Sequence, residues 1–142
     1  MSRFISSKSA VCIAAVIGFL LTTTSVEARR AKPLEDPPRA TWGCELTKKQ
    51  VKQGIATGMT SLGWTPQSQS DGTVFGVIVV REKHTLRVTV KFDTTSFDID
   101  YLSSGNLKYK EVNGVKKIHP HGNGWMRNLN NAILANLQLE CE

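Results

Sequence analysis

Residues 73–101 contain short segments with strand-like side-chain patterns, and these constrain the fold more than any other feature. Residues 73–81 are rich in β-branched side chains, while residues 85–92 and 97–101 alternate between polar and apolar side chains. Because successive side chains of a strand point to opposite faces, this alternation buries one face and leaves the other in water. The segments therefore predict an antiparallel sheet that needs cover on one side only.

The pairing of the last two segments follows from their two faces. Placing Phe92 opposite Phe97 turns the apolar side chains toward one face, and it sets Lys91 opposite Asp98 on the other. A shift of one residue would exchange the faces, so hydrophobicity and charge predict the same register. The side chains that this register turns inward are Val88, Val90, Phe92, Phe97, Ile99 and Tyr101.

Two amphipathic segments flank the strands and predict helices. The first spans about residues 48–62, with Thr47 as its N-cap and Gly63 as its stop. The second spans about residues 124–139, with Asn123 as its N-cap. Their apolar stripes are Val51, Ile55, Met59 and Leu62 in the first helix, and Trp125, Met126, Leu129, Ile133, Leu134 and Leu137 in the second.

The order of these segments predicts an α+β fold of the type α-β-β-β-α. We expect an antiparallel meander of three to four strands with both helices on one face, the extra strand coming from residues 64–70. The dipeptide Asn113-Gly114, between residues 109–112 and 115–118, is typical of a two-residue hairpin. It predicts an additional β-ribbon within the 102–124 loop.

Residues 1–28 predict a secretory signal peptide. An uncharged apolar run at residues 11–21 follows a basic start, and Val26-Glu27-Ala28 suits a cleavage site. The run is shorter than the about 20 residues of a membrane span, and it follows Cys12 instead of preceding it. We expect a soluble exported protein, periplasmic or secreted, with no membrane span after cleavage, rather than a lipid-anchored protein or one with an uncleaved anchor.

The chain after residue 28 divides into a tail and a domain. Residues 29–42 contain several prolines and charges without an apolar period, which predicts a flexible linker. Residues 43–142 predict a single α+β domain, because a chain of this length can bury one core.

Cys44 and Cys141 are the cysteines outside the predicted signal peptide. An exported chain meets oxidising conditions, and an even number of cysteines favours a disulfide bond. That bond would bring the start of the first helix to the end of the second, so the helices would run antiparallel. Two free thiols are the alternative.

The segment His119-Pro120-His121 is a candidate metal site. Two imidazoles two residues apart can bind zinc or copper, and His84 is the candidate third ligand. The alternative is a structural role, in which His119 supports the start of the second helix and His121 is exposed.

The predicted ribbon is a candidate binding surface because it is basic. Its cationic residues, with Tyr109 beside them, suit an anionic partner, and the whole chain has a formal net charge of +6. Export makes nucleic acid an unexpected partner, and a ribbon that simply packs on the domain is the alternative. The lysines of this surface are Lys108, Lys110, Lys116 and Lys117.

Asp98 and Asp100 are the closely spaced carboxylates of the strand region. Paired carboxylates can act as general acid and base, so a small hydrolase that uses them with His119 is a third hypothesis. Cross-strand pairing with Lys91 and Thr89 explains the same residues without catalysis.

Several segments together resemble a known family. They are Leu62-Gly63-Trp64, residues 85–92, residues 97–101, the Tyr101–Tyr109 stretch, Ile118-His119 and Asn123–Leu129. Across about residues 51–137 the chain resembles a family of small exported bacterial proteins of uncharacterised function, many of them lipoproteins. The resemblance implies a bacterial envelope location and an α/β domain, and it implies no known activity. The chain departs from the family in lacking the lipid-anchoring cysteine, and in carrying Gly122 where the family usually has an aromatic residue.

The sequence thus favours a non-enzymatic binding or structural module of the cell envelope, without a cofactor. Its partner is not identified, and an anionic one is the candidate. A periplasmic metal-binding protein is the second hypothesis, and the hydrolase is the third.

Overall fold

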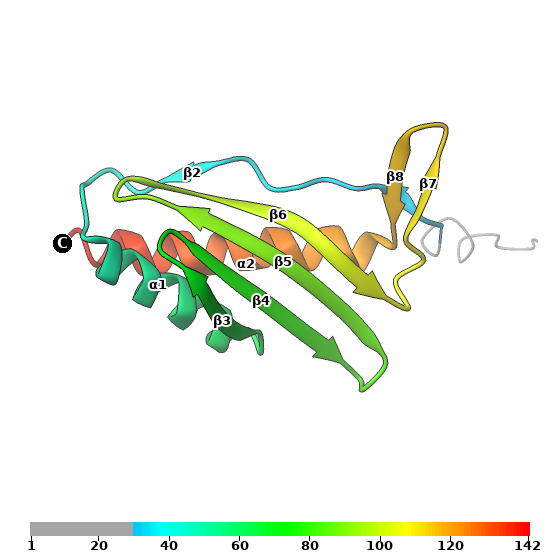
Figure 1. The fold of residues 1–142 in the computed structure, drawn as a ribbon, viewed down its shortest axis with the longest axis horizontal. Helices are drawn as coiled ribbons and strands as arrows, with labels where there is room; N and C mark the ends of the chain where they lie inside the picture. Colours follow the sequence, from blue (N-terminus) through cyan, green and yellow to red (C-terminus); the bar gives the residue numbers. More distant parts are fainter. Residues whose placement is uncertain (1–29) are drawn as a thin grey trace, which may run out of the picture.

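The computed structural model describes residues 30–142, so the predicted signal peptide lies outside the described residues. Two helices and two antiparallel sheets make up the described chain, which confirms the predicted α+β class (Figure 1). Within residues 30–142, neither helix is long and apolar enough to cross a membrane. The strands are β1 (Lys32–Pro33), β2 (Ala40–Thr41), β3 (Thr65–Ser70), β4 (Thr73–Val80), β5 (His84–Phe92), β6 (Ser96–Gly105), β7 (Lys110–Val112) and β8 (Val115–Ile118), and the helices are α1 (Lys48–Ser61) and α2 (Pro120–Leu139).

The larger sheet has the strand order β2-β6-β5-β4-β3 and packs one face against both helices. The predicted pairing of β5 with β6 is confirmed, with Phe92 opposite Phe97 and Lys91 opposite Asp98. Val90 and Ile99 face each other in this register and are completely buried. Alternation and burial therefore agree along the centre of the sheet.

β6 is longer than the predicted segment 97–101, because it continues to Gly105. The register shifts between Arg87 and Val88, where β6 carries one extra residue. Beyond this bulge Leu86 pairs with Ser104, so the inward face is recovered. The extension carries β6 to the end of the molecule where α2 begins (Figure 1).

α1 begins as predicted at the N-cap Thr47. The Thr47 hydroxyl accepts a hydrogen bond from the backbone N–H of Gln50, and the Gln50 side chain accepts one from the backbone N–H of Thr47. Gly63 follows the helix with a φ of 83°, a conformation that suits glycine. Leu62 was predicted to extend the buried stripe, but it is 40% exposed and lies beyond the last helical turn.

The two helices approach each other closely at two glycines of α1. A Cβ atom at Gly58 would lie 2.9 Å from the backbone nitrogen of Ile133, and one at Gly54 would lie 2.5 Å from Leu137 Cδ2. Gly54 meets Leu137, while Gly58, which comes later in α1, meets Ile133, which comes earlier in α2. The helices are therefore antiparallel, as predicted.

The disulfide bond between Cys44 and Cys141 joins the chain just before α1 to the chain just after α2. Its Cα atoms are 5.9 Å apart, and it links positions separated by 97 residues. A covalent loop of this size removes much of the freedom of the unfolded chain, a contribution of about 4.7 kcal/mol in the chain-entropy model. The bond therefore holds the start of α1 beside the end of α2.

Residues 29–42 were predicted to be a flexible linker, and the structure corrects this for the described part. β2 pairs with β6, with Ala40 opposite Phe97, and β1 pairs with β8. Ala40 and Trp42 are buried in the core. The prolines allow an extended chain that runs along the sheet edge, and the domain therefore begins before residue 43.

α2 begins at Pro120, so the prediction of Asn123 as its N-cap was wrong. His119 is the N-cap, and Pro120 fits the first helical position because it has no N–H to satisfy. Asn123 instead anchors the N-terminal segment. Its side chain donates to the Pro33 carbonyl at 2.9 Å and accepts from the Glu35 backbone N–H at 3.0 Å.

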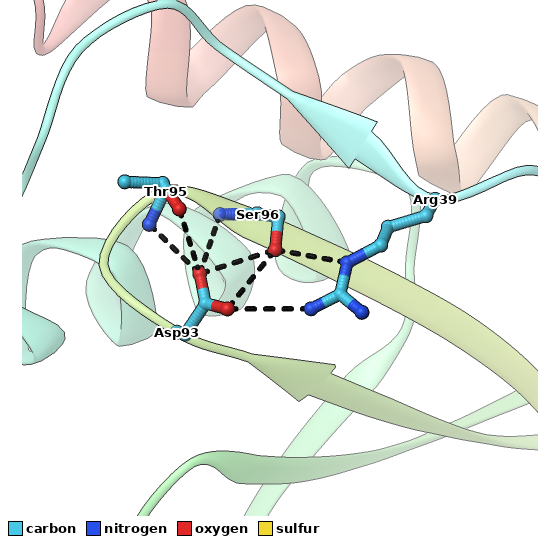
Figure 2. Close-up of polar contacts among 4 residues, drawn as sticks. All are labelled: Arg39, Asp93, Thr95 and Ser96. Carbon is cyan, nitrogen blue, oxygen red and sulfur yellow. Dashed lines mark hydrogen bonds and ion pairs between the residues drawn. The ribbon is translucent and has the colours of Figure 1, made fainter.

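The turn between β5 and β6 is organised by Asp93, as Figure 2 shows. Its carboxylate accepts hydrogen bonds from the backbone N–H groups of Thr95 at 2.9 Å and Ser96 at 2.7 Å. The hydrogen bond from the Thr95 backbone is the largest cause that lowers the pKa of Asp93 from 3.8 to about 2. Arg39 donates to Asp93 at 3.2 Å and to the Ser96 hydroxyl at 2.9 Å, which holds the residue before β2 against this turn.

The glycine contact between the helices can be tested with a matched pair of variants. We expect Gly58→Ala to lower the free energy of unfolding by about 1–3 kcal/mol, because its new methyl group meets the backbone of Ile133. Gly54→Ala gains the same helix propensity but meets only the end of the Leu137 side chain, so it should cost less. Urea denaturation measures both, and equal stabilities would contradict the close backbone approach at Gly58.

Asp93 should make stability depend on pH in the acid range. Its folded pKa is lowered to about 2, so its stabilising contribution is present above the unfolded value of 3.8 and is lost as the pH falls through about 2. The free energy of unfolding of the native chain should exceed that of Asp93→Asn most clearly above about pH 4, and the difference should shrink toward pH 2. Urea denaturation at each pH tests this, with Asp71→Asn at an exposed ion pair as the charge-matched control. If the difference in the free energy of unfolding between the native chain and Asp93→Asn does not change with pH, the ionised Asp93 carboxylate does not stabilise this turn.

Candidate functional site

The candidate site lies at the end of the molecule where α2 begins. The turn between β4 and β5, the end of β6, the first residues of α2 and the smaller sheet all lie toward this end (Figure 1). The smaller sheet has the order β1-β8-β7, so the predicted two-stranded ribbon is joined by a third strand from the N-terminal segment.

Three histidines from distant parts of the sequence line one pocket of about 460 Å³. His84 starts β5, and its Nδ1 lies 2.8 Å from the Asn106 carbonyl oxygen. His119 is the N-cap of α2, and its Nδ1 accepts a hydrogen bond of 3.2 Å from the His121 backbone N–H. The His119 and His121 rings are in edge contact, with their centroids 4.6 Å apart. We call this cavity the histidine pocket.

Cationic and aromatic side chains complete the histidine pocket. Arg81 and Lys108 line it, together with Trp125 of α2. Arg81, Asn106 and Lys108 have positive φ angles of 54°, 57° and 55°. Non-glycine residues rarely adopt this left-handed conformation, which costs of order 1–3 kcal/mol each. The wall of the pocket is therefore built from strained backbone that also carries two of its charges.

The histidine pocket disfavours a further positive charge. Burial is the first cause that lowers the pKa of His119, and the neighbouring His121, Lys108 and His84 lower it further. His119 therefore favours its neutral form more strongly than a free imidazole does.

The structure brings the three predicted metal ligands to one pocket. Among residues 30–142, however, no group of three or more His, Cys, Asp or Glu side chains is arranged to hold a metal ion. The Nδ1 atoms of His84 and His119 already make hydrogen bonds to the backbone. Metal binding by these residues stays a prediction.

The basic ribbon, defined as β7, β8 and the residues that lead into them, borders a cleft of about 680 Å³. The cleft is lined by Arg30, Lys108, Lys110 and Lys117, with Tyr109 and Ala31. Lys110 lies directly opposite Lys117, while Lys116 lies opposite Glu111 and outside the cleft lining. The structure therefore separates Lys116 from the other predicted binding lysines.

Tyr109 attaches the basic ribbon to the larger sheet. Its ring stacks on Tyr101 of β6 with a centroid distance of 5.0 Å and an interplanar angle of 16°. The Tyr101 hydroxyl is hydrogen-bonded to the Ser104 hydroxyl at 2.8 Å, and burial raises the pKa of Tyr101. Because one face of Tyr109 packs on Tyr101, the ring positions the ribbon in addition to lining the cleft.

Asp98 and Asp100 lie on the face of the sheet that turns away from the helices. They flank the buried Ile99, and the Asp100 carboxylate is 3.5 Å from Lys91 Nζ. Neither carboxylate lines the pocket that contains His119. The structure does not bring together the three residues of the hydrolase hypothesis.

Two residues that line the histidine pocket were not chosen as site residues from the sequence. Arg81 was placed at the end of a predicted strand, and Trp125 was assigned to the helix core. Trp125 is half-buried, so it packs against the core and also lines the pocket. Residues 82–84 are predicted to form a turn between two strands, but the sequence does not show that this turn faces α2.

No model of a known protein family matches the chain, and no curated protein sequence is similar to it. The resemblance to small exported bacterial proteins therefore stays a prediction, and the geometry of the site carries the functional interpretation.

The charge around His119 can be measured directly. The pKa of His119 should lie below its usual 6.5, first because of burial and then because of its positive neighbours. Replacing Lys108 with Asn, which tolerates a positive φ, should raise the pKa of His119 by removing one of these charges. Histidine titration by NMR checks both values, with Lys52→Asn on α1 as the control of equal charge change. An unchanged His119 titration in Lys108→Asn would contradict the electrostatic coupling.

Proposed function

We propose that this protein is a non-enzymatic binding module of the cell envelope, and that the basic ribbon contacts an anionic polysaccharide there. We also propose that the protein is exported, either to the periplasm or out of the cell. It draws support from the predicted signal peptide and from the Cys44–Cys141 bond, because disulfide bonds persist in oxidising compartments.

The observation that carries the proposal is the pairing of Lys110 with Lys117. Like charges directly opposite each other on neighbouring strands destabilise a sheet. Here they also share a cleft with Arg30 and Lys108, so cationic side chains from three separate parts of the sequence converge. An anionic partner in the cleft would offset the repulsion between these cationic side chains. The cluster of positive charges therefore favours binding of an anion.

The basic ribbon is also held in place before any partner arrives. β1 pairs with β8 on one side, and Tyr109 stacks on Tyr101 on the other. The His119 backbone N–H donates to the Leu107 carbonyl at 2.7 Å, which ties the start of the ribbon to the start of α2. A contact surface that is already ordered loses less conformational entropy on binding.

The shape of the surface favours a polymer chain over a membrane. Lys108, Lys110 and Lys117 line an open cleft, along which a single extended chain can lie. Lysine and arginine side chains supply positive charge and hydrogen-bond donors, which is what recognition of an anion requires. Binding rather than catalysis is therefore the activity that this surface supports.

The proposal predicts a specific loss of affinity for a polyanion. Dextran sulfate is the probe, and the double variant Lys110→Gln and Lys117→Gln should bind it about 5-fold more weakly or worse. This estimate follows from two charge contacts of about 0.5–1 kcal/mol each. Isothermal titration calorimetry at several salt concentrations measures the affinity, and its salt dependence should become less steep.

The matched control is the double variant Lys49→Gln and Lys52→Gln on the exposed face of α1. It removes the same charge far from the basic ribbon in sequence. If both double variants lose the same affinity, binding depends only on the net charge of the protein. That result would overturn the proposal. Stronger binding to phosphatidylglycerol vesicles than to dextran sulfate would point to a membrane partner instead.

A further inference from the structure

We infer that the histidine pocket is a binding site for a small organic anion that carries a flat apolar group. The ligand class includes aromatic sulfonates, carboxylates and phosphate esters. The inference is independent of the polysaccharide proposal, because it rests on a different cavity that shares only Lys108 with the cleft of the basic ribbon.

The charge of the lining indicates an anion. Arg81 and Lys108 contribute full positive charges to the lining. No Asp or Glu side chain is among the residues that line this pocket in the described chain. Glu82 belongs to the same turn as Arg81, but it lies outside the lining. A cavity that is lined by one sign of charge concentrates ligands of the opposite sign.

The apolar part of the lining indicates an organic ligand instead of a bare inorganic ion. Trp125, Val80 and Leu107 line the pocket beside the cationic groups. The His121 ring lies near Trp125, with centroids 6.2 Å apart and planes tilted by 49°. A cavity of about 460 Å³ with aromatic walls and a few polar groups has the size and composition of small-molecule sites.

The hydrogen bonds of the histidines define which ring atoms can meet the ligand. A backbone N–H only donates, so the Nδ1 of His119 is an acceptor and its proton is on Nε2. His119 therefore offers a donor while it is neutral. A carbonyl only accepts, so the Nδ1 of His84 carries a proton, and its Nε2 becomes a donor when the ring is protonated.

The same arrangement opposes a metal ion. Arg81 and Lys108 would repel a cation, and a neutral His119 with its proton on Nε2 has no ring lone pair left to coordinate it. An anion would instead be attracted by Arg81 and Lys108 and would accept from His119.

Benzenesulfonate is the probe, because it keeps one negative charge at every pH used. We expect it to bind the native chain, to quench Trp125 fluorescence and to shift the ring signals of His119 and His121 in NMR spectra. Benzenesulfonamide lacks the charge and methanesulfonate lacks the ring, so both should bind at least roughly 10-fold more weakly.

Matched variants locate the binding. Arg81→Asn keeps a residue that tolerates the left-handed backbone and should weaken benzenesulfonate binding roughly 10-fold or more. Lys83→Asn removes the same charge from the same turn but outside the pocket lining, so it should bind like the native chain. Lys110→Gln should also leave benzenesulfonate binding unchanged, which separates this inference from the basic ribbon.

Any of three results would overturn the inference. The first is equal affinity in Arg81→Asn and Lys83→Asn, and the second is no binding of benzenesulfonate at millimolar concentration. The third is binding of zinc chloride alone that is lost in His121→Gln, together with no response to benzenesulfonate. That third outcome would assign the pocket to a metal.

Discussion

The close contact between α1 and α2 is the constraint on which the rest of the structure depends. Gly58 lets the backbones approach, so the two helices form one layer that covers the buried face of the larger sheet. The Cys44–Cys141 bond fixes one end of this layer, and Asn123 ties the other end to the N-terminal segment. α2 is thus held along its length, and its first residues are presented in a fixed position beside the sheet.

This fixed position creates two neighbouring basic cavities. His119 and Trp125 come from α2, Arg81 comes from the turn between β4 and β5, and Lys108 comes from the chain that leads into the smaller sheet. Lys108 belongs to both cavities, so a ligand in one would change the electrostatic field in the other.

Local patterns explain which features could be predicted from the sequence. The alternation around Val90 and Ile99 was sufficient for the register, because a shift would have exposed every apolar side chain. Thr47 was recognisable as a cap because capping depends on residues three positions apart. β2 was missed because two residues make no pattern, and its strand character comes from pairing with β6. Asn123 was misassigned because Pro120 offers an earlier helix start, and the histidine pocket depends on contacts between segments that only the folded chain brings together.

The edges of the larger sheet bear on how the protein behaves at high concentration. An exposed edge strand offers free backbone groups to another copy of the chain, which promotes aggregation. On one side β2 is only two residues long, and Asp36 occupies the backbone N–H of Tyr101 at 2.9 Å. On the other side the edge strand β3 contains Pro66, which has no N–H to donate. Both edges of the larger sheet therefore disfavour the addition of a strand from another copy. The segment before α1 thus also disfavours self-association of the protein.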